Sequence, residues 1–248
     1  YSCFVLESAV KQVAQLALAV QLPDDETFVS YQGQTNNNVV SQLKVFIEQL
    51  LAENVDQMIN GLYLFGQSGS GKSHLIHASC TFANELGKSS ICLSLNELKN
   101  LSVEVLDGLE NVDLVCLDDI HYIAGNGDWQ RAIFDLYNRL SERGKCLLIT
   151  GNVSVPRLNL SLPDLISRLS WGHVEQVKLL SDDEKMQAIQ FRARQRGLYL
   201  SDEVVSFLMT RLSREMRALV SALDQLDSAS IREQRRITIP FIKSVINF

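Results

Sequence analysis

The chain has 248 residues, of which 46% are hydrophobic and 21% charged, and its formal net charge is −6. This composition is typical of a folded globular protein and excludes a disordered or low-complexity chain. No apolar run reaches the ~18 to 20 residues of a membrane-spanning helix, so we expect no membrane association and a cytoplasmic location.

Short apolar runs alternate with helical patterns over the first 180 residues. The runs cover residues 62–65, 91–95, 113–118, 146–150 and 174–179. Runs of this length, separated by helices, indicate a parallel sheet with crossover helices. The sequence therefore predicts an α/β base domain over residues 31–179, with a parallel five-stranded sheet and helices on both faces.

The pattern is helical throughout beyond Leu180. Ser181 and Glu184 have the spacing of a capping box, and Gly197 is placed to end the helix that they begin. Ser201 repeats the start signal, and apolar residues three and four apart continue through EMRALVSALDQLDSASI. Residues 180–248 are predicted to form a small all-α domain.

The segment GQSGSGKS (66–73) satisfies the phosphate-loop pattern G-x-x-x-x-G-K-[ST]. It follows an apolar run and leads into a helical pattern, which is the context that the motif requires. Backbone N–H groups and a helix N-terminus attract phosphates there, the lysine contacts the β- and γ-phosphates, and Ser73 supplies an oxygen to Mg²⁺. The predicted nucleotide-binding residues of this segment are Gly66, Ser68, Gly69, Ser70, Gly71, Lys72, Ser73 and His74.

Polar residues follow two of the predicted strands. Asp118 is expected to hold Mg²⁺ through water, and Asp119 to orient or polarise the attacking water. Asn152, at the end of LLITGN (147–152), is placed to sense the γ-phosphate. A solvated turn is the alternative for the aspartates, and an ordinary loop residue for Asn152.

Histidines and cysteines do not indicate a metal site. His74 and His77 have helical spacing but no third ligand, so we assign His77 to helix packing. The five cysteines lack ligand spacing, and those at 92, 116 and 146 fall in the strand-like runs. They are therefore predicted to be buried thiols of a protein in a reducing compartment.

Together these motifs resemble the AAA+ family, and within it the branch of the bacterial replication initiator DnaA. The similar strings are GQSGSGKSHLIHA (66–78), LVCLDDIHYIAG (114–125), SRLSWG (167–172) and REMRALVSALDQL (214–226). The resemblance spans most of residues 22–248. It implies an AAA+ P-loop NTPase base domain followed by a helical lid, with ADP, ATP or another nucleotide bound together with Mg²⁺.

Two features differ from the initiator. The chain stops at Phe248, where the initiator continues into a helix-turn-helix domain that reads DNA. Near the other end, QLALAV (15–20) is similar to the peptide by which many proteins dock on the replicative sliding clamp, the β subunit of DNA polymerase III; a plain helix or strand fragment is the alternative. We assign residues 1–30 to an N-terminal extension with this peptide and a linker. The candidate clamp contacts are Gln15, Leu16, Leu18 and Val20.

These features resemble the regulatory members of the branch, which inactivate the initiator. The resemblance implies a negative regulator of DNA replication initiation that is held at the replisome on the nucleoid and meets DNA indirectly, through the clamp. It would stimulate ATP hydrolysis by DnaA, with weak or no ATPase activity of its own and with ADP as its bound nucleotide. A homodimer is the other assembly that we consider.

The resemblance also assigns roles to single residues. Arg168 is the candidate arginine finger for the nucleotide of a neighbouring subunit, with a salt bridge to Asp164 as the alternative. Arg217 matches the lid arginine that contacts the nucleotide; helix pairing with nearby charged residues is its alternative. The family layout places Phe28 and Tyr31 beside the nucleobase of the bound nucleotide.

Two other functions stay open. A catalytic motor or unfoldase usually carries an aromatic pore loop, but residues 96–112 contain no aromatic residue. A helicase loader or DNA-binding adaptor would contact phosphates through basic helix residues, whereas solvated helix faces are the simpler interpretation of the same residues. These residues are Arg192, Arg194, Arg196, Arg235 and Arg236.

Overall fold

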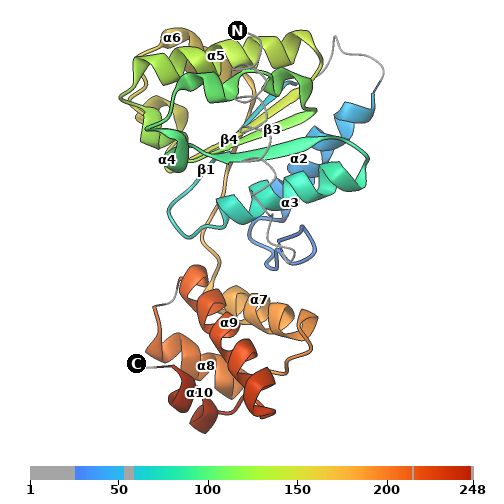
Figure 1. The fold of residues 1–248 in the computed structure, drawn as a ribbon, viewed down its shortest axis with the longest axis vertical. Helices are drawn as coiled ribbons and strands as arrows, with labels where there is room; N and C mark the ends of the chain where they lie inside the picture. The colour runs from blue at the N-terminus through green and yellow to red at the C-terminus, as the bar shows by residue number, and fades with distance from the viewer. Residues whose placement is uncertain (1–25, 53–58, 214, 247–248) are drawn as a thin grey trace, which may run out of the picture.

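The structure is a computed structural model that describes residues 26–52, 59–213 and 215–246 (Figure 1). Its base domain is built on one sheet, and a group of helices follows it in the chain. Figure 1 shows this helical group beyond one end of the base domain. The predicted α/β base with an all-α lid is confirmed.

The sheet is parallel throughout, with the strand order β2-β3-β4-β1-β5. Its strands are β1 (Gly61–Phe65), β2 (Ser90–Ser94), β3 (Leu114–Asp118), β4 (Cys146–Gly151) and β5 (His173–Gln176). Each predicted apolar run forms one of them. The last strand ends earlier than its run, because the chain beyond Val177 leaves the sheet as the connection to the lid.

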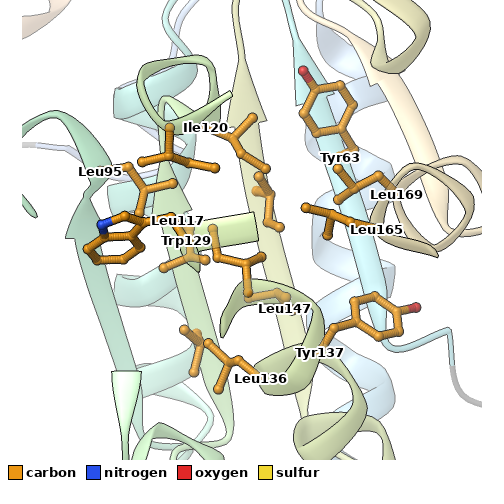
Figure 2. Packing of buried hydrophobic residues seen from close by; sticks show 14 of the residues in the cluster. Tyr63, Leu95, Leu117, Ile120, Trp129, Leu136, Tyr137, Leu147, Leu165 and Leu169 are labelled. Carbon is orange, nitrogen blue, oxygen red and sulfur yellow. The ribbon is translucent and has the colours of Figure 1, made fainter. Parts of the chain in front are cut away.

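Helices cover both faces of the sheet, because successive strand residues point to opposite sides. Leu62 and Leu64 of β1 pack against α2 and α3, whereas Tyr63 between them packs into the opposite cluster. Figure 2 shows that opposite cluster, in which Leu165 and Leu169 lie near Tyr63. The helices are α2 (Asn37–Glu48) and α3 (Lys72–Glu85) on one face, and α4 (Leu95–Leu98), α5 (Gly127–Glu142) and α6 (Pro163–Trp171) on the other.

Short 3₁₀ turns complete the base domain: η1 (Gln49–Leu51), η3 (Val103–Leu106), η4 (Leu109–Asn111), η5 (Ile120–Ile123) and η6 (Val155–Arg157). The four cysteines within the described ranges, Cys80, Cys92, Cys116 and Cys146, are free and buried, as predicted for the three in strands. Among the helices that the structure describes, none is long and apolar enough to cross a bilayer.

The lid has its own hydrophobic core, centred on Leu219, Leu223 and Phe241. Ser181 Oγ accepts the Glu184 N–H (3.2 Å) while the Glu184 carboxylate accepts the Ser181 N–H (2.9 Å), so the capping box is confirmed. Gly197 follows the first lid helix with φ +73°, and Ser201 caps the next. The helices are α7 (Asp182–Gln195), α8 (Asp202–Arg211), α9 (Met216–Glu233) and α10 (Ile239–Val245).

A buried asparagine joins the base to the start of the lid. Asn36, 1% exposed, donates from Nδ2 to Lys178 O (2.9 Å), and its Oδ1 accepts the Lys178 N–H (2.9 Å). The same Nδ2 donates to Tyr31 Oη (2.9 Å), which donates to Ser70 O in the phosphate loop (3.2 Å). One chain of hydrogen bonds therefore connects the phosphate loop, the segment before α2 and the base–lid connection.

Candidate nucleotide site

The phosphate loop lies between the end of β1 and the start of α3, as its sequence predicts. Gly69 and Gly71 have φ +78° and +93°, which glycine adopts without a steric penalty. Gly66 is needed for space, since a Cβ there would lie 2.2 Å from Val177 O. The first turn of α3 presents N–H groups toward the loop, which is the geometry that binds phosphate oxygens.

Lys72 begins α3 and turns back over the loop. Its Nζ donates to Gly66 O (2.8 Å) and Gln67 O (3.2 Å). Burial lowers the pKa of Lys72, while Asp119 and Asp118 act in the opposite direction. A partly desolvated ammonium group next to the loop is suited to contact phosphate oxygens, because its attraction to them is less screened than in water.

The predicted Mg²⁺ ligands lie together. Ser73 Oγ donates to Asp118 Oδ2 (2.7 Å), and Thr150 Oγ1 donates to the other oxygen, Asp118 Oδ1. Thr150 Oγ1 also accepts the Asp119 N–H (2.9 Å). A hydroxyl and a carboxylate are the hard oxygen ligands that Mg²⁺ accepts, with water and phosphate completing its shell. The residues present therefore fit the ion.

Asp119 occupies a left-handed conformation, with φ 64° and ψ 53°. Burial and the neighbouring Asp118 raise the pKa of Asp119, against the attraction of His121, Lys72 and Arg217. His121 Nδ1 lies 3.8 Å from Asp119 Oδ1. A carboxylate held beside a phosphate loop in this way can accept a hydrogen bond from water at the γ-phosphate position.

Base and lid enclose a cleft of about 680 Å³ around these groups. Ser70 Oγ, which is buried beside Gly66, has no hydrogen-bond partner among the residues that the structure describes. Of the eleven predicted residues that line the cleft, nine come from the phosphate loop, the start of α3 and the ends of two strands: Ser68, Gly69, Ser70, Gly71, Lys72, Ser73, His74, Asp119 and Asn152. Tyr31 lines it from the segment before α2, and Arg217 lines it from α9.

Phe28 lies outside the cleft. Its ring packs edge-on against Phe82, with centroids 5.7 Å apart, and it is not among the cleft-lining residues. Its side chain belongs to the packing between α2 and α3, so the structure does not bring it into the cleft, and its place beside the nucleobase stays a prediction. Tyr31 is close to the phosphate loop instead: a Cβ on Gly71 would lie 2.8 Å from its ring.

The structure corrects the predicted exposure of Arg192 in α7. The solvated helix face predicted for it is wrong, since Arg192 is 5% exposed. Its Nη2 lies 3.0 Å from His74 Nδ1 and 3.6 Å from Glu26 Oε1. His77 pairs with the same Glu26 (2.5 Å), beyond the packing role predicted for it. Sequence reasoning missed this cluster, because its members come from three separate segments.

The other four basic helix residues named in the sequence analysis are more exposed than Arg192. Arg194, Arg235 and Arg236 are exposed on the lid. Arg196 forms an ion pair with Asp224 (2.5 Å). Thus only part of the RARQR segment is a solvated face.

Arg168 is exposed and lies away from the cleft of its own chain. Its guanidinium lies 5.6 Å from the centroid of the Tyr137 ring, and Tyr137 packs against Gly61, the first residue of β1. The phosphate loop follows the other end of β1, about 16 Å away at 3.3 Å per residue. Within the described ranges Arg168 and Asp164 form no ion pair, so the alternative role is not observed.

The clamp-binding peptide with Gln15, Leu16, Leu18 and Val20 lies outside the described residues. The assignment of residues 1–30 to an extension stays a prediction for the same reason. Its last part is described, and there Ser30 Oγ and Thr27 O both lie within hydrogen-bonding distance of His74 Nε2 (3.2 and 2.9 Å). Residues 26–30 therefore pack on the base domain.

Known structures share this fold. Domain III of the Thermotoga maritima replication initiation protein DnaA is 20% identical, with 92% of this chain and 98% of that chain covered and a TM-score of 0.73. AMPPCP-bound DnaA from Aquifex aeolicus is 22% identical over 86% of this chain and 71% of that one, with a TM-score of 0.66. The T. maritima RuvB Holliday junction branch migration motor is 16% identical, covering 91% and 72%, with a TM-score of 0.64.

Two family descriptions match the sequence itself, and they divide it at the base–lid connection. Residues 182–246 match the Hda lid domain. Residues 22–176, which include the phosphate loop, both aspartates and Arg168, match the bacterial DnaA ATPase domain. The chain belongs to the family of bacterial DnaA ATPase domains, as a DnaA-related AAA+ protein of the Hda type.

Proposed function

We propose that this protein is a nucleotide-bound negative regulator of replication initiation, which stimulates ATP hydrolysis by DnaA through Arg168. The membership of the chain in the DnaA-related family supports DnaA as the partner. The nucleotide between base and lid, which we take to be ADP with Mg²⁺ at Ser73 and Asp118, serves mainly to fix the two domains relative to each other. Its own ATPase activity is then weak or absent.

The position of Arg168 carries this proposal. It is an exposed arginine at the end of the sheet opposite the phosphate loop, so it cannot contact the nucleotide of its own chain. Cleavage of a γ-phosphate spreads negative charge over oxygens that a guanidinium from another subunit stabilises, by about 10³ to 10⁵ in rate. Tyr137 holds the side chain in place through a cation–π contact while leaving it accessible.

The test is ATP hydrolysis by DnaA in the presence of DNA-loaded clamp. Arg168→Ala should abolish the stimulation while nucleotide binding and clamp binding persist. Arg131→Ala, which removes an exposed arginine from α5, is the matched control and should stimulate normally. Full stimulation by Arg168→Ala would remove the arginine from this role.

We also propose that residues 15–20 tether the protein to the sliding clamp. Gln15 would fill a small polar site, and Leu18 and Val20 an apolar groove. A flexible tether raises the local concentration to roughly millimolar, which makes a weak contact effective. Replacement of Gln15, Leu16 and Leu18 by Ala should eliminate capture on immobilised clamp; persistent capture would refute the assignment.

A protein with this function acts in the cytoplasm. It contacts DNA indirectly, through the sliding clamp. A helicase loader or DNA-binding adaptor is less well supported, because Arg192, one of its candidate phosphate contacts, is buried against His74 and Glu26. Direct binding to DNA would weaken steeply with salt. We therefore expect little binding to free DNA without the clamp, measured by a salt titration.

A further inference from the structure

Trp171, the last residue of α6, is 86% exposed. The other tryptophan, Trp129, is 1% exposed in the core of the base domain. Tryptophan carries a large apolar surface that is seldom left in water, and it is enriched among residues that dominate binding energy at protein interfaces. A side chain exposed to this degree is available for contact with another molecule.

Trp171 lies beside Arg168. The two residues are three positions apart on α6, so they share one side of the helix, while Leu165 and Leu169 face the core. We call Arg168 and Trp171 together the α6 patch. In Figure 1, α6 lies at the end of the base domain farthest from the lid. Both residues of the patch are exposed, so a second molecule can reach them.

We infer that Trp171 anchors the α6 patch on the rim of the nucleotide cleft of ATP-bound DnaA. This inference rests on the proposed function and extends it, since it names the residue that supplies affinity while Arg168 supplies the rate. The charge of the patch supports this occupant: the exposed guanidinium of Arg168, which forms no ion pair with any residue of the described ranges, is complementary to triphosphate.

A second copy of this chain is a poorer occupant. The α6 patch and the cleft are different surfaces of one molecule, so docking between copies would be head-to-tail. Such contacts continue into rings or open filaments instead of ending in a pair. A partner with a triphosphate-loaded cleft gives a complex of defined size.

The first experiment separates affinity from rate in the stimulated hydrolysis assay. Trp171→Ala should raise the DnaA concentration at half-maximal stimulation about 10- to 100-fold, with the maximal rate unchanged. Tyr199→Ala removes another strongly exposed aromatic, 79% exposed and in the lid, and should change neither quantity. An unchanged half-maximal concentration in Trp171→Ala would overturn the inference.

The second experiment observes the docking directly. Since the chain has 2 tryptophans, 5-fluorotryptophan labelling gives two ¹⁹F resonances, which Trp171→Phe assigns. Unlabelled ATP-bound DnaA should shift or broaden the Trp171 resonance and leave that of Trp129 in place. A Trp171 resonance that stays fixed, or one that shifts with the concentration of this chain alone, would overturn the inference.

The two proposals can fail separately. If Arg168→Ala abolishes stimulation but Trp171→Ala changes nothing, the anchor is wrong and the proposed function stands. If the wild-type chain does not stimulate hydrolysis at all, the proposed function is wrong. The ¹⁹F titration then still decides whether Trp171 docks on DnaA.

Discussion

At the scale of single residues, the site depends on side chains that hold one another in place. Ser73 and Asp118 are identifiable from their motifs, whereas Thr150 is not, since nothing in the order of residues places it beside the acidic pair. The structure shows its hydroxyl between Asp118 and the backbone of Asp119. Thr150 and Ser73 thus each hold one oxygen of the Asp118 carboxylate.

Thr150→Val tests this role, because valine keeps the shape and removes the hydroxyl. The buried carboxylate and N–H would each lose a partner, at a cost of about 1 to 3 kcal/mol. We expect a lower free energy of unfolding and weaker Mg²⁺-dependent nucleotide affinity, measured by denaturant titration and calorimetry. Thr210→Val, at an exposed lid position, should change neither.

Glu184 links the lid cap to the segment before α2. Its carboxylate accepts the Ser181 N–H, the Thr35 N–H (2.9 Å) and the Thr35 hydroxyl (2.8 Å). Burial alone would raise the pKa of Glu184, but these hydrogen bonds lower it from 4.5 to about 2. A pKa lowered by folding stabilises the protein above pH 4.5, and the stabilisation is lost as the pH falls toward 2.

Glu184→Gln should therefore destabilise the protein most near neutral pH, by about 1 kcal/mol, the usual magnitude for a helix cap. The difference from wild type should shrink as the pH falls below 4.5. Thermal melts at pH 7 and at pH 3 measure it, and Glu203→Gln, exposed in the first turn of α8, is the control. A pH-independent difference would contradict the charge-based explanation.

At the scale of elements, the segment before α2 acts as a brace between β5 and α7. Asn36 makes both hydrogen bonds to the Lys178 backbone that a neighbouring strand would make, and it also holds Tyr31 on the phosphate loop. The side chain of Asn36 is thus hydrogen-bonded both to Tyr31 at the phosphate loop and to the connection that leads into the lid.

Asn36→Ala should lower the free energy of unfolding by about 2 to 3 kcal/mol, because it leaves the backbone groups of Lys178 without partners. It should also weaken nucleotide binding, since Tyr31 loses its orientation. Asn37→Ala changes an exposed neighbour at the start of α2 and is the matched control. Equal effects of the two substitutions in a denaturant titration would contradict the brace.

At the scale of the whole molecule, the base domain has two hydrophobic clusters and the lid has one, and a polar cleft lies between the two domains. The base and lid clusters share no residue, and the contacts between the two domains include Arg192 with His74 and Glu184 with Thr35. A ligand that contacts both domains therefore contributes much of the energy that holds them in one arrangement.

Nucleotide should accordingly raise the stability of the whole chain, by about 2.7 kcal/mol at 100 times its dissociation constant. It should also slow proteolytic cleavage between residues 177 and 182. Lys72→Ala removes the charge that we propose contacts the phosphates, and it should abolish both effects while the protein stays folded. Melting curves and timed proteolysis with and without nucleotide measure this; protection that survives in Lys72→Ala would contradict it.

The sequence by itself determined the elements of this protein and the conformation of its phosphate loop. Apolar runs and caps act over a few residues, so they predict the strands, the lid helices and the loop from Gly66 to Ser73. Contacts between distant segments were decided only by tertiary structure: Arg192 buried against His74, Phe28 turned to Phe82, and Thr150 on Asp118. Local patterns cannot encode them, because which residues meet depends on how the sheet and its helices pack.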